Sequence, residues 1–300
     1  MQAHTPRVSI GLPVYNGGAL LRDAIESVLS QTYKDFELVI SDNRSTDGTE
    51  QICRRYAGND DRVRYHRSDV NRGLAWNYNR VFELARGEYF KWAAHDDVCE
   101  PRFVERCVDV LERMPAVVLC YPRAVLIDEH GDYVKDCRDP GSLDSPKPNE
   151  RFRDLLRNLG LSNPLFGVIR SNVLGTTPLI GGYLASDIPL LAELALLGKF
   201  HELPEPLFRR RDHPQKAERA NPTLDDMATV YDPANRGKLH LLNWRLFFEH
   251  LASIRHVPMG AREKVLCYLH MGRWFGWRWK LLRDELTGTP RQILRRSKSV

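Results

Sequence analysis

The sequence 89-YFKWAAHDD-97 joins an apolar run to two adjacent carboxylates. The run from Tyr89 to Ala94 has the length of a buried strand, and Asp96 and Asp97 follow it almost at once. A buried strand that ends in paired acids places hard oxygen ligands at the edge of a sheet. A divalent cation and a phosphate-bearing substrate both have access to such an edge. The segment therefore predicts an α/β sheet with a binding site beyond the end of this strand.

Strand-like and helix-like segments alternate through the first half of the chain, which is typical of an α/β sheet with parallel strands. We expect five strands, at residues 8–12, 36–41, 63–66, 89–94 and 117–127. Apolar residues recur with helical spacing between and after them. We therefore expect helices at residues 19–31, 49–56, 74–85 and 101–113.

The second half of the chain has a less regular pattern. Residues 150–159 and 187–197 are expected to be helical, whereas residues 136–149 are expected to form a flexible loop able to move over a site. Four prolines between residues 204 and 222 indicate loops and short extended pieces. Beyond them the pattern is helical again, in two segments separated by residues 258–260.

The 300 residues carry a formal net charge of +5, which is unevenly distributed. Residues 261–300 hold ten Lys and Arg against three Asp and Glu, a balance of +7, so the first 260 residues sum to about −2. No apolar run reaches the ~18 residues of a transmembrane helix, and the N-terminus has no apolar signal-peptide core. The six cysteines show no CxxC pair and no disulfide-like spacing. We expect a cytoplasmic protein with reduced thiols and no zinc site.

Polar motifs follow the first two predicted strands. Residues 13–18 (PVYNGG) and 41–49 (SDNRSTDGT) lie beyond the carboxyl ends of these strands, where open α/β sheets bind ligands. Tyr15 can stack on a base, and Asp42 can accept a hydrogen bond from a base imide or a ribose. Backbone amides near Gly17-Gly18 can meet phosphate oxygens. The alternative is that residues 43–49 are only a helix-capping turn.

An ordered series of motifs covers residues 7–128. The series is PVYN (13–16), SVLSQTY (27–33), FELVISDN (36–43), STDGT (45–49), NRG (71–73), Asn79, ARGEY (85–89) and Asp96-Asp97. In this order the motifs resemble the family 2 glycosyltransferases of the GT-A fold, and a chance occurrence of the whole series is improbable.

The resemblance implies the fold class and the division of the chain. The fold would be the α/β GT-A fold of nucleotide-diphospho-sugar transferases, a Rossmann-like mixed sheet flanked by helices, with a C-terminal helical extension. The catalytic domain would span residues 1–230, with a nucleotide-sugar half at about 1–128 and an acceptor half at about 129–230. Residues 231–300 would form the extension.

The resemblance also implies roles for individual residues. The nucleotide-sugar would be bound by Pro13, Tyr15, Asn16, Asp42, Asn71 and Asp96. Asp97 would fill the metal role of the family's DXD motif and hold Mn²⁺ or Mg²⁺ against the leaving diphosphate. Two departures from the family are His95, in place of the first acid of that motif, and Tyr78, in place of an Arg. The alternative for Asp96-Asp97 is a solvated turn, with Asp97 capping the next helix.

Two later segments complete the predicted site. Asp187 opens a predicted helix, as the family's catalytic base does, and would take the proton of the acceptor hydroxyl. A mere helix cap is the alternative for Asp187. Arg211 and His213 resemble the family's basic segment and would bind the donor diphosphate, Arg211 through a forked guanidinium contact. The alternative for this segment is a solvated basic turn.

The C-terminal segment 261–285 interleaves aromatic and basic residues. A basic helix with several Trp residues can lie in a lipid headgroup layer, which would bring the protein to a lipid-linked acceptor at the inner face of the cell membrane. The alternative is that these aromatic residues pack the helix onto the catalytic domain or onto a second copy in a homo-oligomer. No nucleic-acid-binding motif accompanies the basic residues, so we expect no nucleic-acid partner.

The predicted function is a metal-dependent, inverting transfer of a hexosyl or related group from a nucleotide-sugar, with a UDP-sugar favoured. The acceptor would be a glycan or a glycolipid. The alternatives are a nucleotidyltransferase with a similar sheet and a catalytically silent, membrane-associated scaffold. A dehydrogenase is excluded because no GxGxxG motif follows the first predicted strand.

Overall fold

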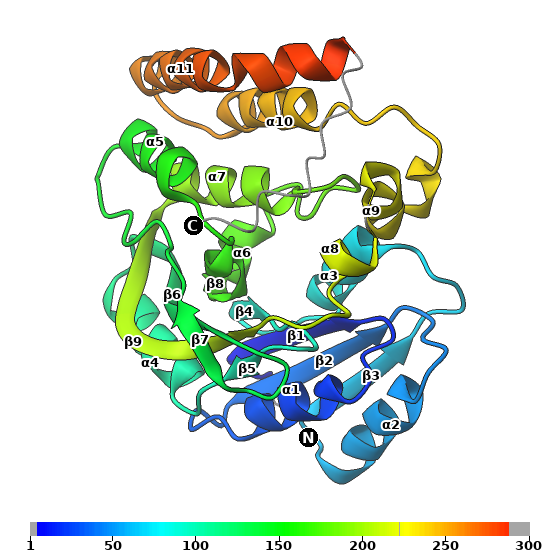
Figure 1. Ribbon diagram of the computed structural model, residues 1–300. Coiled ribbons are helices and arrows are strands. Elements are labelled where there is room, and N and C mark those ends of the chain that lie inside the picture. The colour runs from blue at the N-terminus through cyan, green and yellow to red at the C-terminus, as the bar shows by residue number, and fades with distance from the viewer. Residues whose placement is uncertain (1–4, 222, 288–300) are drawn as a thin grey trace.

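The computed structural model describes residues 5–221 and 223–287, and over these residues the chain forms one nine-stranded mixed sheet flanked by helices (Figure 1). The strand order is β3-β2-β1-β4-β8-β6-β9-β5, and β7 pairs with β6 outside this path. The strands are β1 Val8–Val14, β2 Phe36–Asp42, β3 Val63–Arg67, β4 Tyr89–Trp92, β5 Val98–Cys99, β6 Val117–Ile127, β7 Tyr133–Asp136, β8 Val168–Arg170 and β9 Lys199–Arg211.

Helices cover both faces of this sheet. Figure 1 shows α1 and α2 beneath β1, β2 and β3, and α3 above them. The helices are α1 Leu20–Leu29, α2 Thr49–Asn59, α3 Leu74–Glu83, α4 Phe103–Arg113, α5 Pro148–Asn158, α6 Ser171–Leu174, α7 Asp187–Leu197, α8 Ala217–Ala220, α9 Leu224–Tyr231, α10 Leu242–His256 and α11 Ala261–Leu286, with 3-10 turns at Asn163–Phe166 and Pro233–Asn235.

The first four strands in the order β3-β2-β1-β4 run parallel, so their carboxyl ends meet at one edge. Every residue of β1 is buried, as expected for a central strand with helices on both faces. The predicted α/β mixed sheet is confirmed, and all five predicted strands are present. β5, β7, β8 and β9 were not predicted, since three of them are only two to four residues long.

The strand β9 overturns one prediction. Its thirteen residues lie partly in a region where prolines predicted loops and short pieces. β9 pairs in parallel with β6, but its register shifts between Leu203, opposite Pro122, and Phe208, opposite Ala124. Pro204 and Pro206 both lie in this irregular stretch, where the backbone needs no ladder hydrogen bond. The prolines therefore mark a bulge within a strand and not its end.

The segment predicted as a flexible loop at residues 136–149 is tied to β9. Leu143 is buried and exchanges backbone hydrogen bonds with Phe200. The Tyr121 hydroxyl donates to the carbonyl of Gly141, and the amide of Glu202 donates to the hydroxyl of Ser142. In this structure the segment lies along the sheet and does not extend over the carboxyl ends of β1 and β2.

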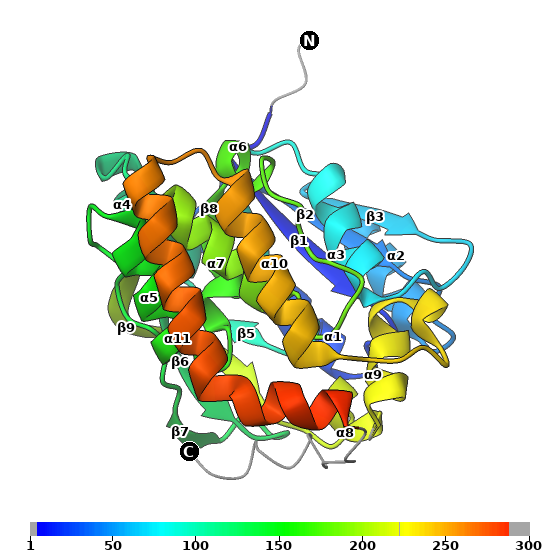
Figure 2. The same cartoon turned by 90° about the horizontal axis from the view of Figure 1, so that it is seen from above.

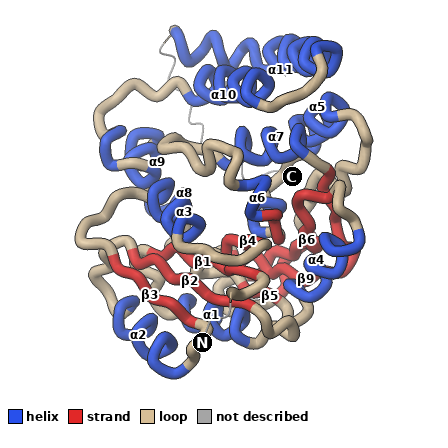
Figure 3. Tube along the Cα trace, turned by 180° about the vertical axis from the view of Figure 1, so that it is seen from behind, coloured by secondary structure: helices blue, strands red, loops and turns tan. Residues whose placement is uncertain are grey.

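A helical layer lies beyond the sheet and contains α5, α7, α10 and α11 (Figures 1 and 3). α7 is buried along most of its length because α5 and α10 both pack on it. α11 packs on α5 and α10, and Figure 2 shows α10 and α11 side by side as the outermost helices of this layer. These two helices are the two helical segments predicted on either side of residues 258–260. The predicted domain boundary at residue 230 stays a prediction. Residues 288–300 of the predicted extension lie outside the described residues.

Within the described part of the chain, we find no helix long and apolar enough to cross a membrane.

Arg151 of α5 fixes the end of α7. Its buried guanidinium donates to the carbonyls of Ala195, Leu196 and Ser145, two of which belong to the last turn of α7 and have no partner within that helix. We expect Arg151→Met to lower the free energy of unfolding by about 2–4 kcal/mol, since three buried carbonyls lose their donor. Urea denaturation followed by circular dichroism measures this change.

The matched control is Arg153→Met on the same helix. Arg153 pairs with Asp154 at the partly exposed surface, so its loss should cost less than about 1 kcal/mol. Equal destabilisation by the two substitutions would show that the contacts of Arg151 with α7 are not what matters.

Candidate active site

A cavity of about 1650 Å³ opens at the carboxyl ends of the parallel strands. It lies between the loops that follow β1, β2 and β4 on one side and the start of α7 with α9 on the other. Eight of the ten predicted site residues line it, namely Pro13, Tyr15, Asn16, Asn71, Asp96, Asp97, Asp187 and His213. The remaining two, Asp42 and Arg211, lie directly behind its wall.

The loops after β1 and β2 are joined by side chain to backbone hydrogen bonds. The amide of Asn16 donates to the hydroxyl of Ser45 (2.9 Å), and the amide of Gly17 donates to the hydroxyl of Thr49 (2.9 Å). The amide of Gly18 donates to the carboxylate of Asp47 (3.1 Å). The expectation that amides near the glycine pair meet phosphate is therefore corrected, because the Gly17 and Gly18 amides are already bonded within the protein.

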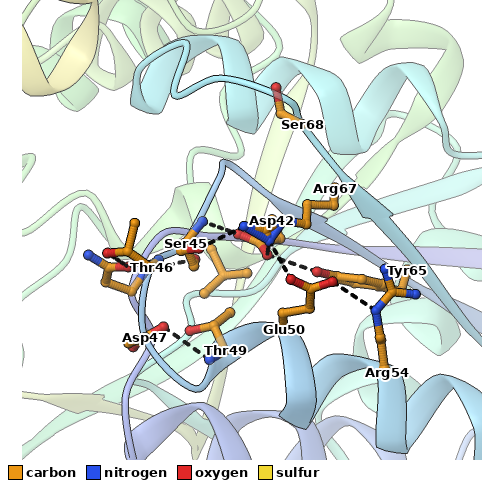
Figure 4. Close-up of polar contacts among 12 residues, drawn as sticks. Asp42, Ser45, Thr46, Asp47, Thr49, Glu50, Arg54, Tyr65, Arg67 and Ser68 are labelled. Carbon is orange, nitrogen blue, oxygen red and sulfur yellow. Dashed lines mark hydrogen bonds and ion pairs between the residues drawn. The ribbon is translucent and has the colours of Figure 1, made fainter.

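Asp42 is the last residue of β2, where the second loop begins, and it is fully buried (Figure 4). One carboxylate oxygen accepts from the amide of Ser45 (2.7 Å), and the other accepts from the hydroxyl of Tyr65 (2.8 Å). The Arg67 guanidinium lies 3.6 Å from the same carboxylate. This residue anchors the loop after β2, while its neighbour Asn43 lines the cavity. The predicted contact of Asp42 with the base or ribose stays a prediction.

Asn77 of α3 was not predicted as a site residue. Its buried amide nitrogen donates to the carbonyls of Val14 and Ser41, and so joins the ends of β1 and β2. Its side-chain oxygen lacks a hydrogen-bond partner among the described residues, and the residue lines the cavity. A buried acceptor without a partner is costly, which is typical of a group that meets a ligand. The sequence gives no signal for this role, because it depends on how α3 packs across two strand ends.

The turn after β4 carries the two acids of the opening motif. Asp97 is buried, and one carboxylate oxygen accepts the backbone amide of Arg211 (2.8 Å). Asp96 forms a hydrogen bond with Nε2 of His213 (2.9 Å). The helix α4 starts only at Phe103, so Asp97 does not cap it. The alternative of a solvated capping turn is therefore wrong.

The electrostatics of this turn separate the two acids. Burial alone would raise the pKa of Asp96, but the hydrogen bond with His213 and the nearby charges of His95, Lys216 and His213 together outweigh burial, so the pKa of Asp96 lies below its usual range. Burial and then the charge of Asp96 raise the pKa of Asp97. The hydrogen bond with Asp96 in turn raises the pKa of His213. Asp97 is thus a buried carboxyl group whose ionised form calls for a cation.

The donor set of this turn fits a divalent cation that shares its ligands with a substrate. Across residues 5–221 and 223–287, no three His, Cys, Asp or Glu side chains are grouped closely enough to hold a metal ion. Mg²⁺ is commonly held by one or two carboxylates together with substrate phosphates. Asp97, with Asp96 and His213 beside it, supplies the oxygen and nitrogen ligands that such a shared site needs.

Three consecutive arginines end β9, and they alternate between its two faces. Arg211 is buried and donates to the backbone carbonyls of Asp96 (3.0 Å) and Glu129 (3.0 Å), and it pairs with Asp23. Arg210 points the other way and lines the cavity. The alternative of a solvated basic turn is wrong for Arg211 and His213, which are 3% and 4% exposed. A clamp on diphosphate by Arg211 stays a prediction and would require it to release these contacts.

Arg210 is the guanidinium that sequence reasoning missed. It donates to the side chain of Asn163 (2.8 Å) and to the carbonyl of Leu161, which hold it at the wall of the cavity. The period of two along a strand would have assigned Arg210 and Arg211 to opposite faces. That signal was lost because the prolines hid the strand.

Tyr78, one of the two departures from the family pattern, also lines the cavity. Burial, followed by the charges of Asp96, Asp97 and Asp187, raises the pKa of its hydroxyl. Its phenol therefore stays protonated and is a hydrogen-bond donor in an acidic cavity.

Asp187 is the first residue of α7 and faces the cavity from the side opposite β4. Burial raises its pKa, and a hydrogen bond from Ser162 offsets part of that rise. Ser162 and Ala185 both have positive φ angles, 58° and 61°, as does Asn16 at 52° across the cavity. Such backbone conformations are costly outside glycine and tend to gather at functional sites. Asp187 is therefore a carboxyl group with a raised pKa that lines an already formed cavity.

The family model described as glycosyl transferase family 2 matches residues 9–174. An uncharacterised glycosyltransferase of Rickettsia felis is 35% identical over 163 residues, which are 53% of this chain and 26% of that protein. The chain spans 26%, 22% and 55% of the length of three curated relatives that it matches.

Two solved structures share the fold at low sequence identity. The structure of Staphylococcus aureus TarS residues 1–349 with UDP superposes with a TM-score of 0.66 at 15% identity, over 95% of this chain and 75% of that chain. The mannosyltransferase PcManGT of Pyrobaculum calidifontis, in complex with GDP-Man and Mn²⁺, gives a TM-score of 0.51 at 17% identity, over 96% and 89% of the two chains. The predicted GT-A type of fold is thereby confirmed.

The hydrogen bond from Gly17 to Thr49 tests the joining of the two loops. Thr49→Val keeps the shape of the side chain but leaves the buried amide of Gly17 without an acceptor. We expect the free energy of unfolding to fall by about 1–3 kcal/mol. The control is Thr46→Val in the same loop, whose exposed hydroxyl makes only a long contact of 3.5 Å and should change stability by less than about 0.5 kcal/mol. Equal effects in urea denaturation would contradict this role.

Proposed function

Because the chain belongs to glycosyl transferase family 2, we propose that its cavity transfers a sugar from a nucleotide-sugar donor to an acceptor hydroxyl group. One observation carries the proposal. Asp187 lies far from the adjacent Asp96 and Asp97 in sequence, yet all three line the same cavity together with the loops at the strand ends. A nucleotide, a diphosphate and an acceptor need such a set of groups within one space.

For the donor, we propose a UDP-sugar bound along the ends of β1 and β2. Tyr15 is 45% exposed at the cavity wall, so its ring is free to stack on a base. The unpartnered oxygen of Asn77 can accept a hydrogen bond from the donor, and Asn71 and Asn16 also line the cavity. TarS has been solved with UDP and with UDP-GlcNAc, which favours uridine over the guanosine carried by the mannosyltransferase neighbour.

For the metal, we propose Mn²⁺ or Mg²⁺ at Asp97. Asp96 and His213 lie next to this carboxylate, and the other ligands would come from the diphosphate. When bound, the metal would neutralise the charge that develops on the diphosphate as the glycosidic bond breaks. Arg210 adds a fixed positive charge at the same wall, and its fork of donors suits phosphate oxygens.

For the chemistry, we propose a single displacement with inversion at the anomeric carbon. Asp187 removes the proton of the acceptor hydroxyl, and the acceptor oxygen forms a bond to the anomeric carbon. The bond from that carbon to the diphosphate breaks at the same time, and its electron pair leaves with the nucleoside diphosphate. The raised pKa of Asp187 supports this role, because a base with a higher pKa binds the proton more strongly.

Arg211 has a positioning role in this proposal. Its amide and guanidinium bind Asp97 and the carbonyl of Asp96, which fixes the two carboxylates relative to the cavity. His213 holds the other carboxylate through its hydrogen bond to Asp96. Both residues belong to the segment predicted to bind the donor diphosphate. His213 lines the cavity, so in this proposal it can contact the diphosphate as well as Asp96.

The two alternative functions remain distinguishable by product. A nucleotidyltransferase would release pyrophosphate, whereas a glycosyltransferase releases a nucleoside diphosphate. A silent scaffold would release neither and would bind no nucleotide-sugar. Against a scaffold, all three acids of the site are present and buried or half-buried in the cavity.

For the acceptor, we propose a hydroxyl of a glycan or a glycolipid. With a glycolipid, contact of residues 261–285 with the inner face of the cell membrane is the predicted route to the acceptor. A homo-oligomer that packs these residues onto a second copy is the alternative partner.

Donor binding is expected to depend on metal through Asp97. In thermal unfolding, UDP or a UDP-sugar with Mn²⁺ should raise the melting temperature more than either alone, since the two share ligands; at a concentration of 100 Kd the stabilisation is about 2.7 kcal/mol. Asp97→Asn should lose the metal-dependent part of this rise. The control is Asp144→Asn, an exposed carboxylate away from the cavity. A metal-dependent rise that survives Asp97→Asn would remove Asp97 from the metal site.

The base is tested by Asp187→Asn. Release of nucleoside diphosphate in the presence of acceptor should fall by about 10²–10⁴-fold, the usual contribution of a general base, while donor binding stays within about twofold. The control is Asp61→Asn, an exposed acid just before β3 that does not line the cavity. In the unmutated protein, kcat/KM should fall on acidification at a higher pH than for an ordinary aspartate, because burial raises the pKa of Asp187 and a base must be deprotonated. Full turnover of Asp187→Asn would exclude this residue as the base.

A further inference from the structure

The outermost helices, α10 and α11, present a surface that is apolar and basic at once. We call it the outer face and define it by its exposed apolar residues Phe248, Val265, Tyr268, Leu269, Phe275 and Trp279 and its exposed basic residues Arg255, Arg262, Arg273 and Lys280. Figure 2 looks down on these two helices. An apolar patch with a basic border on one side of a protein marks a site of interaction.

The outer face contains only some of the aromatic residues of this segment. Trp274 is buried and packs between Phe247 and His250, so it serves the contact between α11 and α10. Leu269 and Val265 are 59% and 56% exposed, and Phe248 of α10 is 58% exposed. One side of α11 thus packs internally, as one of the two alternatives predicted, and the other side remains uncovered.

The apolar residues of α11 follow one line of the helix. Val265, Leu269, Gly272 and Gly276 are spaced by three or four residues, so they share one side. Tyr268, Phe275 and Trp279 lie next to this line on the side toward α10, where Phe275 contacts Trp244 and Phe247. The result is a broad apolar stripe across two helices.

The charges of α10 and α11 are sorted by sign. The carboxylates of Glu263 and Glu285 accept hydrogen bonds from Asn149 and Asn243, which ties them to other parts of the layer. The other two acids, Glu249 and Asp284, pair with arginines on their own helices. Every acid of the two helices is therefore already engaged.

The cations of the outer face have no such partners. In the part of the chain that the structure describes, Arg255, Arg262, Arg273 and Lys280 make no ion pair. Arg262, Arg273 and Lys280 are three and then two helical turns apart, so they form a row beside the apolar stripe. The outer face thus combines an exposed apolar stripe with a row of positive charge.

We propose that the outer face docks on the surface of a membrane that contains anionic lipids. Apolar and aromatic side chains would enter the boundary between headgroups and acyl chains, and the row of cations would meet lipid phosphates. A second copy of the chain fits less well, because a symmetric contact would oppose two rows of like charge. A nucleic acid would leave Val265 and Leu269 without a hydrocarbon partner.

Docking by this face would also fix where the proposed sugar transfer takes place, and this step rests on that proposed transfer. α7 lies directly beneath α10 and begins with Asp187, and its Glu193 pairs with His256 at the end of α10 (2.9 Å). A membrane on the outer face would therefore hold the proposed base at a fixed distance from the lipid surface. This arrangement suits an acceptor whose sugar is carried on a lipid.

The experiment is sedimentation of the full chain with vesicles in the absence of any donor. Vesicles of phosphatidylcholine alone are compared with vesicles that also contain phosphatidylglycerol, at low and at physiological salt. We expect binding to the anionic vesicles that weakens with salt. Asp187→Asn should bind as the unmutated protein does, so that failure of the proposed transfer leaves this measurement intact.

Two variants of the outer face change binding in opposite directions. The double variant Arg273→Glu and Lys280→Glu should weaken binding to anionic vesicles by at least about 25-fold, since each basic residue near such a surface contributes roughly fivefold. Gly276→Leu should strengthen it several-fold, because a side chain there meets no atom within 4 Å and extends the apolar stripe.

Matched controls carry the same changes elsewhere. Arg55→Glu with Arg113→Glu reverses two exposed charges away from the outer face, and Gly58→Leu adds the same side chain to open space on α2. Neither control should change binding by more than about twofold. No binding to anionic vesicles, equal effects of the variants and their controls, or a dimer in sedimentation velocity that the double variant dissociates would overturn the proposal.

Discussion

Two adjacent carboxylates held out of water at the end of β4 are the constraint on which the rest of the structure depends. Ionised Asp96 and Asp97 repel each other, and burial penalises both. The protein meets this cost from a distant part of the chain, because Arg211 and His213 at the end of β9 supply the hydrogen bonds. Asp97 and Arg211 are more than a hundred residues apart in sequence, so this turn is stabilised only when β9 is in place.

The long course of β9 follows from that need. It runs beside β6, bulges at its two prolines and then pairs with the short strand β5, which directly follows the acids. The last residues of β9 thereby reach the acid turn from behind, while Arg210 faces the cavity. Strand alternation places Arg210 at the cavity wall, on the face opposite Arg209 and Arg211. Arg209 forms an ion pair with Glu100, and Arg211 is the buried brace of the acid turn.

The first half of this fold was predictable because its signals are local. Strands β1, β2 and β4 are short and largely apolar, and the loops after them carry motifs whose side chains mostly reach the cavity as expected. The rest depends on contacts distant in sequence. β9 was missed because prolines indicate a break unless the partner strand tolerates a bulge, and Asn77 acts only through the packing of α3 across two strand ends. Residue type was enough to identify Asp96, Asp97 and Asp187 as site residues. Only the course of β9 shows that Arg210 lines the cavity and that Arg211 is buried behind it.

The uneven charge of the sequence gains a physical meaning from the layer that contains α7. Acids gather at the cavity on one side of this helix, among them the buried Asp97 with its raised pKa. Unpaired cations gather on the outer face of α10 and α11 on the other side. Charges of opposite sign on a single face would pair and cancel, so their separation by a buried apolar helix keeps both available. The proposed contact with an anionic membrane and the proposed metal site would therefore lie on opposite sides of α7, and neither field would quench the other.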